Sequence, residues 1–228
     1  MRQKITKQWL SCWLYVITLI SGMILGVTAV KWNAWDLQTK VFAFATALLP
    51  IHVLEEWHLP GGFHTMYNLM AGSEDVDRYP MNQLSDMWTN FIGVIFGCVV
   101  LIIGVNPFFA VMQLFLCAAE IFGHINGGIF AYKKFRENGK KTVYNPGLFT
   151  TVFGYLPVAA GLLVSFFKGQ APTWRQAAIA VACGMALGAF SLQGVEKICK
   201  DENSPYGYTW GDGYFEKYLK VKRGQNIK

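Results

Sequence analysis

A histidine and two glutamates, His52, Glu55 and Glu56, lie inside a long apolar segment of this chain. Ionisable side chains are costly in a membrane, and where they occur they mark functional sites. There is no Lys or Arg between Lys40 and Arg78, so no basic side chain nearby in the sequence neutralises these acids. A proton, a metal ion or a residue from another part of the chain must balance their charge.

A second apolar segment carries Glu120 and His124 at an i,i+4 spacing, which puts both side chains on one helical face. If both segments are helices that enter the membrane from the same side, His52 lies about 22 Å and His124 about 24 Å along them. Imidazole and carboxylate groups together suit Zn, Fe or Mn. We therefore predict a divalent metal site made from a set of two histidines and three glutamates, namely His52, Glu55, Glu56, Glu120 and His124.

In this site Glu55 and Glu56 are the predicted catalytic residues, because a spare carboxylate beside a metal can act as a general base. Three polar residues near the same depth, Asp86, Asn90 and Asn126, are candidates to support the ligands. His58 and His64 flank the Pro-Gly-Gly turn that ends the second segment at the cytoplasmic interface, and they are candidates to gate or complete the site. If Asp86 were a ligand too, the set would have the composition of a carboxylate-bridged di-metal centre. The glutamate and histidine order differs from that pattern, which favours a single ion.

Two other interpretations of the same residues stay open. The carboxylates could form a proton relay or an ion pathway, or they could form a polar network that only fixes helix packing. Several enzyme classes are excluded, because the chain lacks a phosphate-binding loop, a nucleophile elbow and a His-Glu-x-x-His zinc motif. Its four histidines are too few for an eight-histidine membrane desaturase.

The elements that must position these residues are membrane helices. Hydrophobic residues make up 53% of the 228 positions and charged residues only 15%, a balance typical of integral membrane proteins. A helix needs roughly 20 apolar residues to cross the hydrocarbon core. We predict an all-α polytopic bundle with six such segments: Trp9 to Val30, Leu37 to Trp57, Leu84 to Val105, Phe108 to Tyr132, Leu148 to Phe167 and Trp174 to Val195.

The distribution of positive charge predicts the orientation of this bundle. If the N-terminus is inside, the inner segments hold 16 of the 20 Lys and Arg residues. We therefore expect both termini in the cytoplasm, in a bacterial cytoplasmic membrane, with the first segment retained as a span. The net charge of +6 reflects this topology and does not indicate nucleic-acid binding.

The domain organisation follows from the same segments. Residues 1–195 form the predicted transmembrane domain, and residues 196–228 form a cytoplasmic tail rich in basic and aromatic residues. The five cysteines have no CxxC pair and are interpreted as small packing residues.

The run from His52 to Phe63, with Glu-Glu and Pro-Gly-Gly-Phe, is followed by Glu120-x-x-x-His124 and an Asn145-Pro-Gly turn. These motifs resemble the HXXEE family of small multi-spanning membrane proteins over about residues 41–163. The family is named for its motif, so the resemblance implies signature positions and no activity. A weaker similarity is to CAAX-protease-like membrane enzymes, but the arginine that follows their Glu-Glu pair is absent here.

Together these features predict a metal-dependent membrane enzyme, a hydrolase or an oxidase, acting on a lipophilic substrate among membrane lipids. A proton- or ion-coupled transporter that uses the same carboxylates is the alternative from a different class. A non-catalytic membrane subunit is the third.

Overall fold

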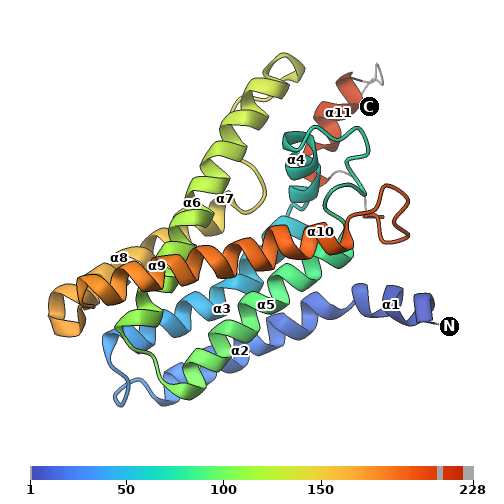
Figure 1. The fold of residues 1–228 in the computed structure, drawn as a ribbon. Coiled ribbons are helices and arrows are strands. Elements are labelled where there is room, and N and C mark those ends of the chain that lie inside the picture. The colour runs from blue at the N-terminus through green and yellow to red at the C-terminus, as the bar shows by residue number, and fades with distance from the viewer. Residues whose placement is uncertain (1, 210–212, 223–228) are drawn as a thin grey trace.

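A computed structural model describes residues 2–209 and 213–222 of the chain. These residues form helices and loops without a β-strand, as the all-α prediction requires. Figure 1 shows the bundle. Its six membrane-length apolar helices are Trp13–Val30, Leu37–Trp57, Gln83–Ile103, Pro107–Asn138, Leu148–Gln170 and Trp174–Cys199.

The first three spans are single helices, and the last three are composite. The single helices are α2 (Trp13–Val30), α3 (Leu37–Trp57) and α5 (Gln83–Ile103). The fourth span is α6 (Pro107–Phe135) with the 3₁₀ turn η1 (Arg136–Asn138). The fifth is α7 (Leu148–Thr150), the π-helical turn η2 (Thr151–Tyr155), α8 (Leu156–Ser165) and a second π-turn η3 (Phe166–Gln170). The sixth is α9 (Trp174–Gly188), the π-turn η4 (Ala189–Gly194) and α10 (Val195–Cys199).

The first span begins later than its apolar pattern predicts. Trp9 belongs to a separate helix, α1 (Arg2–Leu10), and the spanning helix α2 starts at Trp13. At the break, the Ser11 hydroxyl donates to the Gln8 carbonyl and the Cys12 thiol donates to the Trp9 carbonyl. Such side-chain bonds compete with the helical ladder, so a polar α1 and an apolar α2 meet at a bend.

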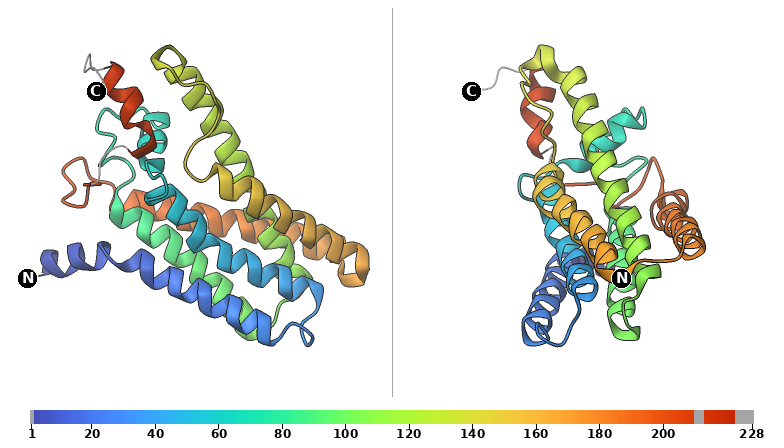
Figure 2. Two further views of the ribbon diagram at one scale, coloured as in Figure 1. Left: turned by 180° about the vertical axis from the view of Figure 1, so that it is seen from behind. Right: turned by 90° about the vertical axis from the view of Figure 1, so that its left-hand side faces the viewer.

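Helix α3 lies at the centre of the bundle and packs against α2, α5, α6 and α8. Half of its most apolar stretch is buried inside the protein, against 17% to 33% for the other spans. Two further views show α2, α5 and the fifth span around it (Figure 2). Because α3 is enclosed by protein, it is the span best able to carry polar side chains away from lipid.

At one end of the bundle, the last turns of α6 pack against two short helices, α4 (Phe63–Met70) and α11 (Glu216–Lys222). The 3₁₀ turn η5 (Gly213–Phe215) directly precedes α11. The shared apolar cluster joins residues far apart in the sequence: Met66, Ala131, Phe135, Phe215, Tyr218 and Leu219. The segment predicted as a tail therefore contributes to the packed structure. Its last residues, 223–228, lie outside the described part.

Candidate metal centre

Four of the predicted site residues meet between α3 and α6. His52 and Glu56 lie on α3, and Glu120 and His124 lie on α6, each pair at an i,i+4 spacing. The Nε2 atoms of the two histidines are 3.2 Å apart. Oε1 of Glu56 lies 3.4 Å from Nε2 of His52 and 3.3 Å from Nε2 of His124. Oε2 of Glu120 lies 3.6 and 3.8 Å from the same two nitrogens.

These separations match the distances between the ligands of one tetrahedral ion. Four donors that each lie about 2.1 Å from an ion are about 3.4 Å from one another. The distances among His52, His124 and Glu56 fall within 0.2 Å of that value, and those to Glu120 are slightly longer. His52, His124 and Glu120 also offer three donor atoms within 4.8 Å of one another. The two histidines together with either glutamate therefore have the ligand types and the spacing of a metal site.

A neighbouring hydroxyl assigns the tautomer of His52. Its Nδ1 lies 2.7 Å from Oγ1 of Thr150. That hydroxyl donates to Oε2 of Glu55 at 2.6 Å, so its oxygen can only accept from the histidine. The network thus places the ring proton on Nδ1 and leaves the lone pair of Nε2 facing the group.

The turn before the fifth span assigns the tautomer of His124 in a similar way. Nδ2 of Asn145 donates to the His124 carbonyl, so its Oδ1 faces Nδ1 of the ring, 2.9 Å away, as an acceptor. Gly147 follows in the left-handed region, with φ of 95°, and lies against the imidazole. A Cβ at Gly147 would be 2.7 Å from Nε2 of His124, so only glycine allows this approach. The ring is therefore both oriented and tightly enclosed.

The two tautomers leave two unprotonated Nε2 atoms facing each other across 3.2 Å. Lone pairs at that distance repel, and Oε1 of Glu56 beside them adds a third electron-rich atom. His52 and His124 are each 2% exposed and Glu56 is 6% exposed, so bulk water does not screen them. A cation between these atoms, either a metal ion or a proton, relieves the repulsion.

Glu55, predicted as a ligand and a catalytic residue, faces away from this group because adjacent helical residues point about 100° apart. Its carboxylate accepts from the backbone N–H groups of Phe149 and Thr150 at 3.1 and 2.8 Å, and from the Thr150 hydroxyl. Tyr144 donates a further hydrogen bond at 3.0 Å. Burial, together with Glu55, raises the pKa of Tyr144, so its hydroxyl stays protonated. Glu55 thus caps the start of the fifth span and reaches His52 only through Thr150.

Asp86 and Asn90 form a separate polar network instead of supporting the ligands. Oδ2 of Asp86 accepts from the Trp57 indole at 2.6 Å and from the Tyr208 hydroxyl at 2.7 Å. Oδ1 accepts from Asn90 at 2.8 Å. Burial and Asp86 raise the pKa of Tyr208, which keeps this hydroxyl a donor. The network joins α3, α5 and the segment after α10.

The remaining predicted residues lie outside the group of four. His64 stacks on Tyr208 with ring centroids 3.8 Å apart and lies 3.4 Å from Oδ1 of Asp77. His58 ends α3 and stacks near Tyr15. Asn126 is half-buried and donates to a carbonyl of its own helix. The structure therefore does not bring His64, His58 or Asn126 next to the candidate ligands.

Glu120 differs from the other three candidate ligands in its exposure. Its side chain is 42% exposed, against 8% for Glu56. It lines a cavity of about 110 Å³ whose walls come from α3, α5, α6 and the fifth and sixth spans. Thr89, Asn90 and Tyr155 are among the polar residues of this cavity, beside apolar side chains. The candidate metal centre is therefore open on one side, toward the interior of the bundle.

The comparisons with known proteins give one positive result. Residues 43–162, more than half of the chain, match the model of a family described as proteins of unknown function with an HXXEE motif. The chain belongs to the HXXEE family. No curated protein and no solved structure matches it. The matched region contains all four candidate ligands and also Asn145, Gly147 and Thr150.

Thr150 and Asn145 orient the two histidines, but the sequence identified Asn145 only as part of a turn and did not identify Thr150. They lie 98 and 21 residues from the histidine that each one contacts. The Asn145-Pro-Gly turn before an apolar span was the available signal, because such a turn has a defined backbone geometry. The contact from Thr150 has no comparable sequence signal.

Proposed function

We propose that this HXXEE family member is a metal-dependent membrane hydrolase that acts on a lipophilic substrate. The arrangement of His52, His124 and Glu56 is the observation that carries the proposal, since it supplies three inward-facing donors at the spacing of one ion. Two histidines and one glutamate are the ligand set of several hydrolytic zinc enzymes, which keep a fourth position open. A divalent ion held there would polarise a carbonyl group and lower the pKa of a coordinated water.

Glu120 is the proposed general base, in place of Glu55 and Glu56. Glu56 lies at ligand distance from both histidines, and Glu55 is used to cap the fifth span. Glu120 is farther from the histidine nitrogens and borders the cavity. It would take a proton from the attacking water and return it to the leaving group as the scissile carbon–oxygen or carbon–nitrogen bond breaks.

The cavity beside Glu120 supports a lipophilic substrate. Its walls combine apolar residues such as Leu49 and Phe96 with the polar groups Thr89 and Asn90. Its volume of about 110 Å³ suits one polar group of a larger molecule, whose hydrocarbon part would extend among the spans. By the distribution of Lys and Arg, we place this site near the cytoplasmic leaflet.

Metal analysis of detergent-purified protein is the first test. After equilibration with Zn²⁺, Mn²⁺ or Fe²⁺, we expect one ion per wild-type chain, with the metal lost in His52→Ala, His124→Ala and Glu56→Ala. His58→Gln is the matched control, because His58 ends the same helix and lies outside the group. A wild-type protein without stoichiometric metal would refute the proposal, and metal retained in all three variants would show that the ligands are wrong.

Activity is tested with Glu120→Gln, which should keep the metal and lose turnover. Membrane lipid extract would be incubated with the metal-loaded wild type and with Glu120→Gln, and the products compared by mass spectrometry. A product made only by the wild type, with incorporation of one oxygen from ¹⁸O-labelled water, is the expected result. Oxygen taken from O₂ would indicate an oxidase and contradict the hydrolytic step.

A second candidate function is cation transport, because cavities lie on two sides of the histidine pair. The first borders Glu120, and the other, about 310 Å³, is lined by Glu55, Tyr144 and Thr150. Hydrogen bonds from His52 through Thr150 to Glu55 connect the pair with the second cavity. Metal uptake by sealed proteoliposomes, abolished in His52→Ala and accompanied by a change in internal pH, would favour this function over hydrolysis.

A further inference from the structure

Tyr155 carries a buried hydroxyl group that the protein does not use as a hydrogen-bond donor. Tyr155 ends the π-turn η2 and is 2% exposed, and its ring packs edge-on against His52 with centroids 5.2 Å apart. Across the described residues 2–209 and 213–222, no atom accepts a hydrogen bond from this hydroxyl. Buried tyrosine hydroxyls usually have a partner, so this donor is available to a bound molecule.

Tyr155 lines the cavity of about 110 Å³ that also borders Glu120. The other hydroxyl groups of this cavity wall already donate to backbone carbonyls. Thr46 donates to Phe42, Thr89 to Ser85 and Ser191, and Ser191 to Gly188. Among the hydroxyl groups of the wall, Tyr155 is therefore the donor that a substrate can engage without breaking a bond inside the protein.

Asn90 brings an unused acceptor to the same cavity. Its Nδ2 donates to the backbone carbonyl of Asp86 at 2.9 Å and to Oδ1 of Asp86 at 2.8 Å, which fixes the orientation of the side-chain amide. Its own Oδ1 accepts no hydrogen bond from the part of the chain that the structure describes, although Asn90 is only 8% exposed. A buried acceptor without a donor is costly, so a substrate N–H group would be bound favourably here.

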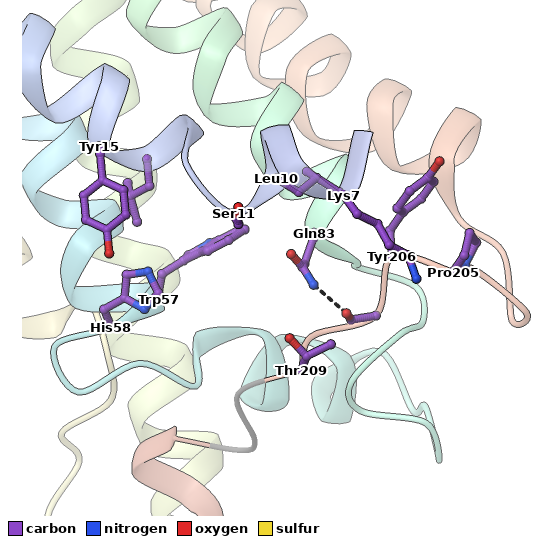
Figure 3. Close-up of a pocket in the computed structure, with 12 residues that line it drawn as sticks. Lys7, Leu10, Ser11, Tyr15, Trp57, His58, Gln83, Pro205, Tyr206 and Thr209 are labelled. Atoms are coloured by element: carbon purple, nitrogen blue, oxygen red, sulfur yellow. Dashed lines mark hydrogen bonds between the residues drawn. The ribbon is translucent and has the colours of Figure 1, made fainter. Parts of the chain in front are cut away.

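A larger cavity, of about 300 Å³, lies where α1 meets α2 and offers a less suitable site. Its basic side chains, Lys7 and His58, lie at opposite ends in Figure 3. The side chain of Gln83, between them, already donates to the Gly207 carbonyl. We therefore place the polar group of the substrate beside Glu120 and not in this larger cavity.

We propose that the substrate is a lipid amide, with its carbonyl oxygen bound by the Tyr155 hydroxyl and its N–H group bound by Oδ1 of Asn90. A secondary amide has one acceptor and one donor on adjacent atoms, so it can satisfy both unused groups. An ester would satisfy only Tyr155 and would leave the Asn90 oxygen unpaired, which is the basis for discrimination between the two. The inference rests on the proposed hydrolase function for the reaction, but the recognition of the amide does not require the metal.

The same contacts would assist cleavage of the amide. As the oxygen of water bonds to the acyl carbon, negative charge develops on the carbonyl oxygen, to which Tyr155 donates. Glu120 takes a proton from that water and gives it to the nitrogen as the carbon–nitrogen bond breaks. The products are a fatty acid and an amine. Tyr155 is thus a proposed catalytic residue, and Asn90 is a proposed specificity residue.

Native mass spectrometry of the full chain in detergent, kept metal-free with a chelator, tests the recognition separately from hydrolysis. The protein would be titrated with N-hexyldecanamide and with hexyl decanoate, an amide and an ester of the same length. We expect the amide to bind at least tenfold more tightly, Asn90→Leu to remove this preference, and Tyr155→Phe to weaken both probes about tenfold. Tyr208→Phe is the matched control for Asn90→Leu, because it also removes a hydrogen bond to Asp86 but does not line the cavity.

Infrared spectroscopy distinguishes direct contact by Tyr155 from a structural role. The carbonyl stretch of ¹³C-labelled hexyl decanoate should move to lower frequency on binding to the wild type and should not do so in Tyr155→Phe. The Tm of this variant should stay unchanged, because its hydroxyl has no partner in the protein to lose. Tyr67→Phe is the control, since the Tyr67 hydroxyl donates to Glu196 outside the cavity.

The outcomes separate the two proposals. Tighter binding of the amide by a protein that takes up no metal would support the recognition and refute the hydrolase function. Equal binding of amide and ester by the wild type would overturn the amide assignment, as would an unchanged preference in Asn90→Leu that still folds by circular dichroism. Loss of the preference in Tyr208→Phe would overturn the role of Asn90. Unchanged affinity and carbonyl frequency in Tyr155→Phe would overturn the role of Tyr155.

Discussion

Replacing Gly147 by alanine should displace His124 from the candidate metal centre. The new Cβ would clash most closely with Cε1 of the ring and would also lie 2.7 Å from Nε2 and 2.9 Å from Nδ1, whereas ordinary contact begins at 3.4 Å. Relief of the Nε2 contact alone requires a movement of about 0.7 Å and relief of the Cε1 contact requires more, which is several times the ~0.2 Å tolerance of a metal–ligand bond. We expect the metal affinity to fall about 100-fold, or about 2.7 kcal/mol, measured by competition with a chromophoric chelator.

Gly139→Ala is the control for this experiment. Gly139 has a φ of 89°, close to the 95° of Gly147, but a Cβ there would meet nothing within 4 Å. Both variants should lose about 1 to 2 kcal/mol of stability from the left-handed conformation, measured by thermal unfolding in detergent. Only Gly147→Ala should also lose metal. Equal metal affinity in the two variants would refute the assignment of His124 as a ligand.

Two further predictions follow from the hydrogen-bond networks, and a third follows from the burial of Lys140. Thr150→Val and Glu55→Gln should each weaken metal binding about tenfold, because each breaks the hydrogen-bonded chain that supports His52. The double variant should bind metal only slightly more weakly than either single variant, since both changes act on the same chain. Additive losses of affinity in the chelator assay would contradict this shared chain. Tyr208→Phe removes a hydrogen bond to Asp86 and should lower the stability, measured by thermal unfolding, by about 1 to 3 kcal/mol. The metal content should stay unchanged. A loss of metal would show that the Asp86 network and the candidate metal centre are coupled. Burial lowers the pKa of Lys140 from its ordinary value of 10.5, so the unfolded chain binds more protons between the two values. The stability of the wild type relative to Lys140→Met should therefore rise as the pH is raised toward 10.5, and a falling difference in Tm would contradict this sign.

The structure explains the spacing of the motif that names the family. His52 and Glu56 are one helical turn apart and face the same group, while Glu55 points to the neighbouring fifth span. The first and last motif residues can therefore share one ion, and the middle glutamate holds the helix that carries Thr150. The two consecutive carboxylates therefore have different roles: Glu56 lies beside the two histidines, and Glu55 binds the start of the fifth span.

Much of the fold was accessible from the sequence, and the reasons are local. Apolar length alone identified the six spans, with boundary errors where polar residues interrupt a helix, as at Ser11. The i,i+4 pairs of α3 and α6 were also predicted, because helical rise fixes depth along each span. Its position along the helix placed Asp86 near the depth of the candidate ligands. Its side chain, however, points to the face of α5 that meets Trp57 and Tyr208.

The sequence by itself determined the class of the protein, the number of its spans and the depth at which its polar residues gather. These properties follow from transfer of single segments into lipid and from the fixed rise of a helix, so no knowledge of packing is needed. Only the tertiary structure decided which side chains face one another, because that depends on the rotation and contact of separate helices. It placed Glu56 with the histidines and Glu55 outside them, and it brought Thr150 and Asn145 to the rings whose nitrogens they orient.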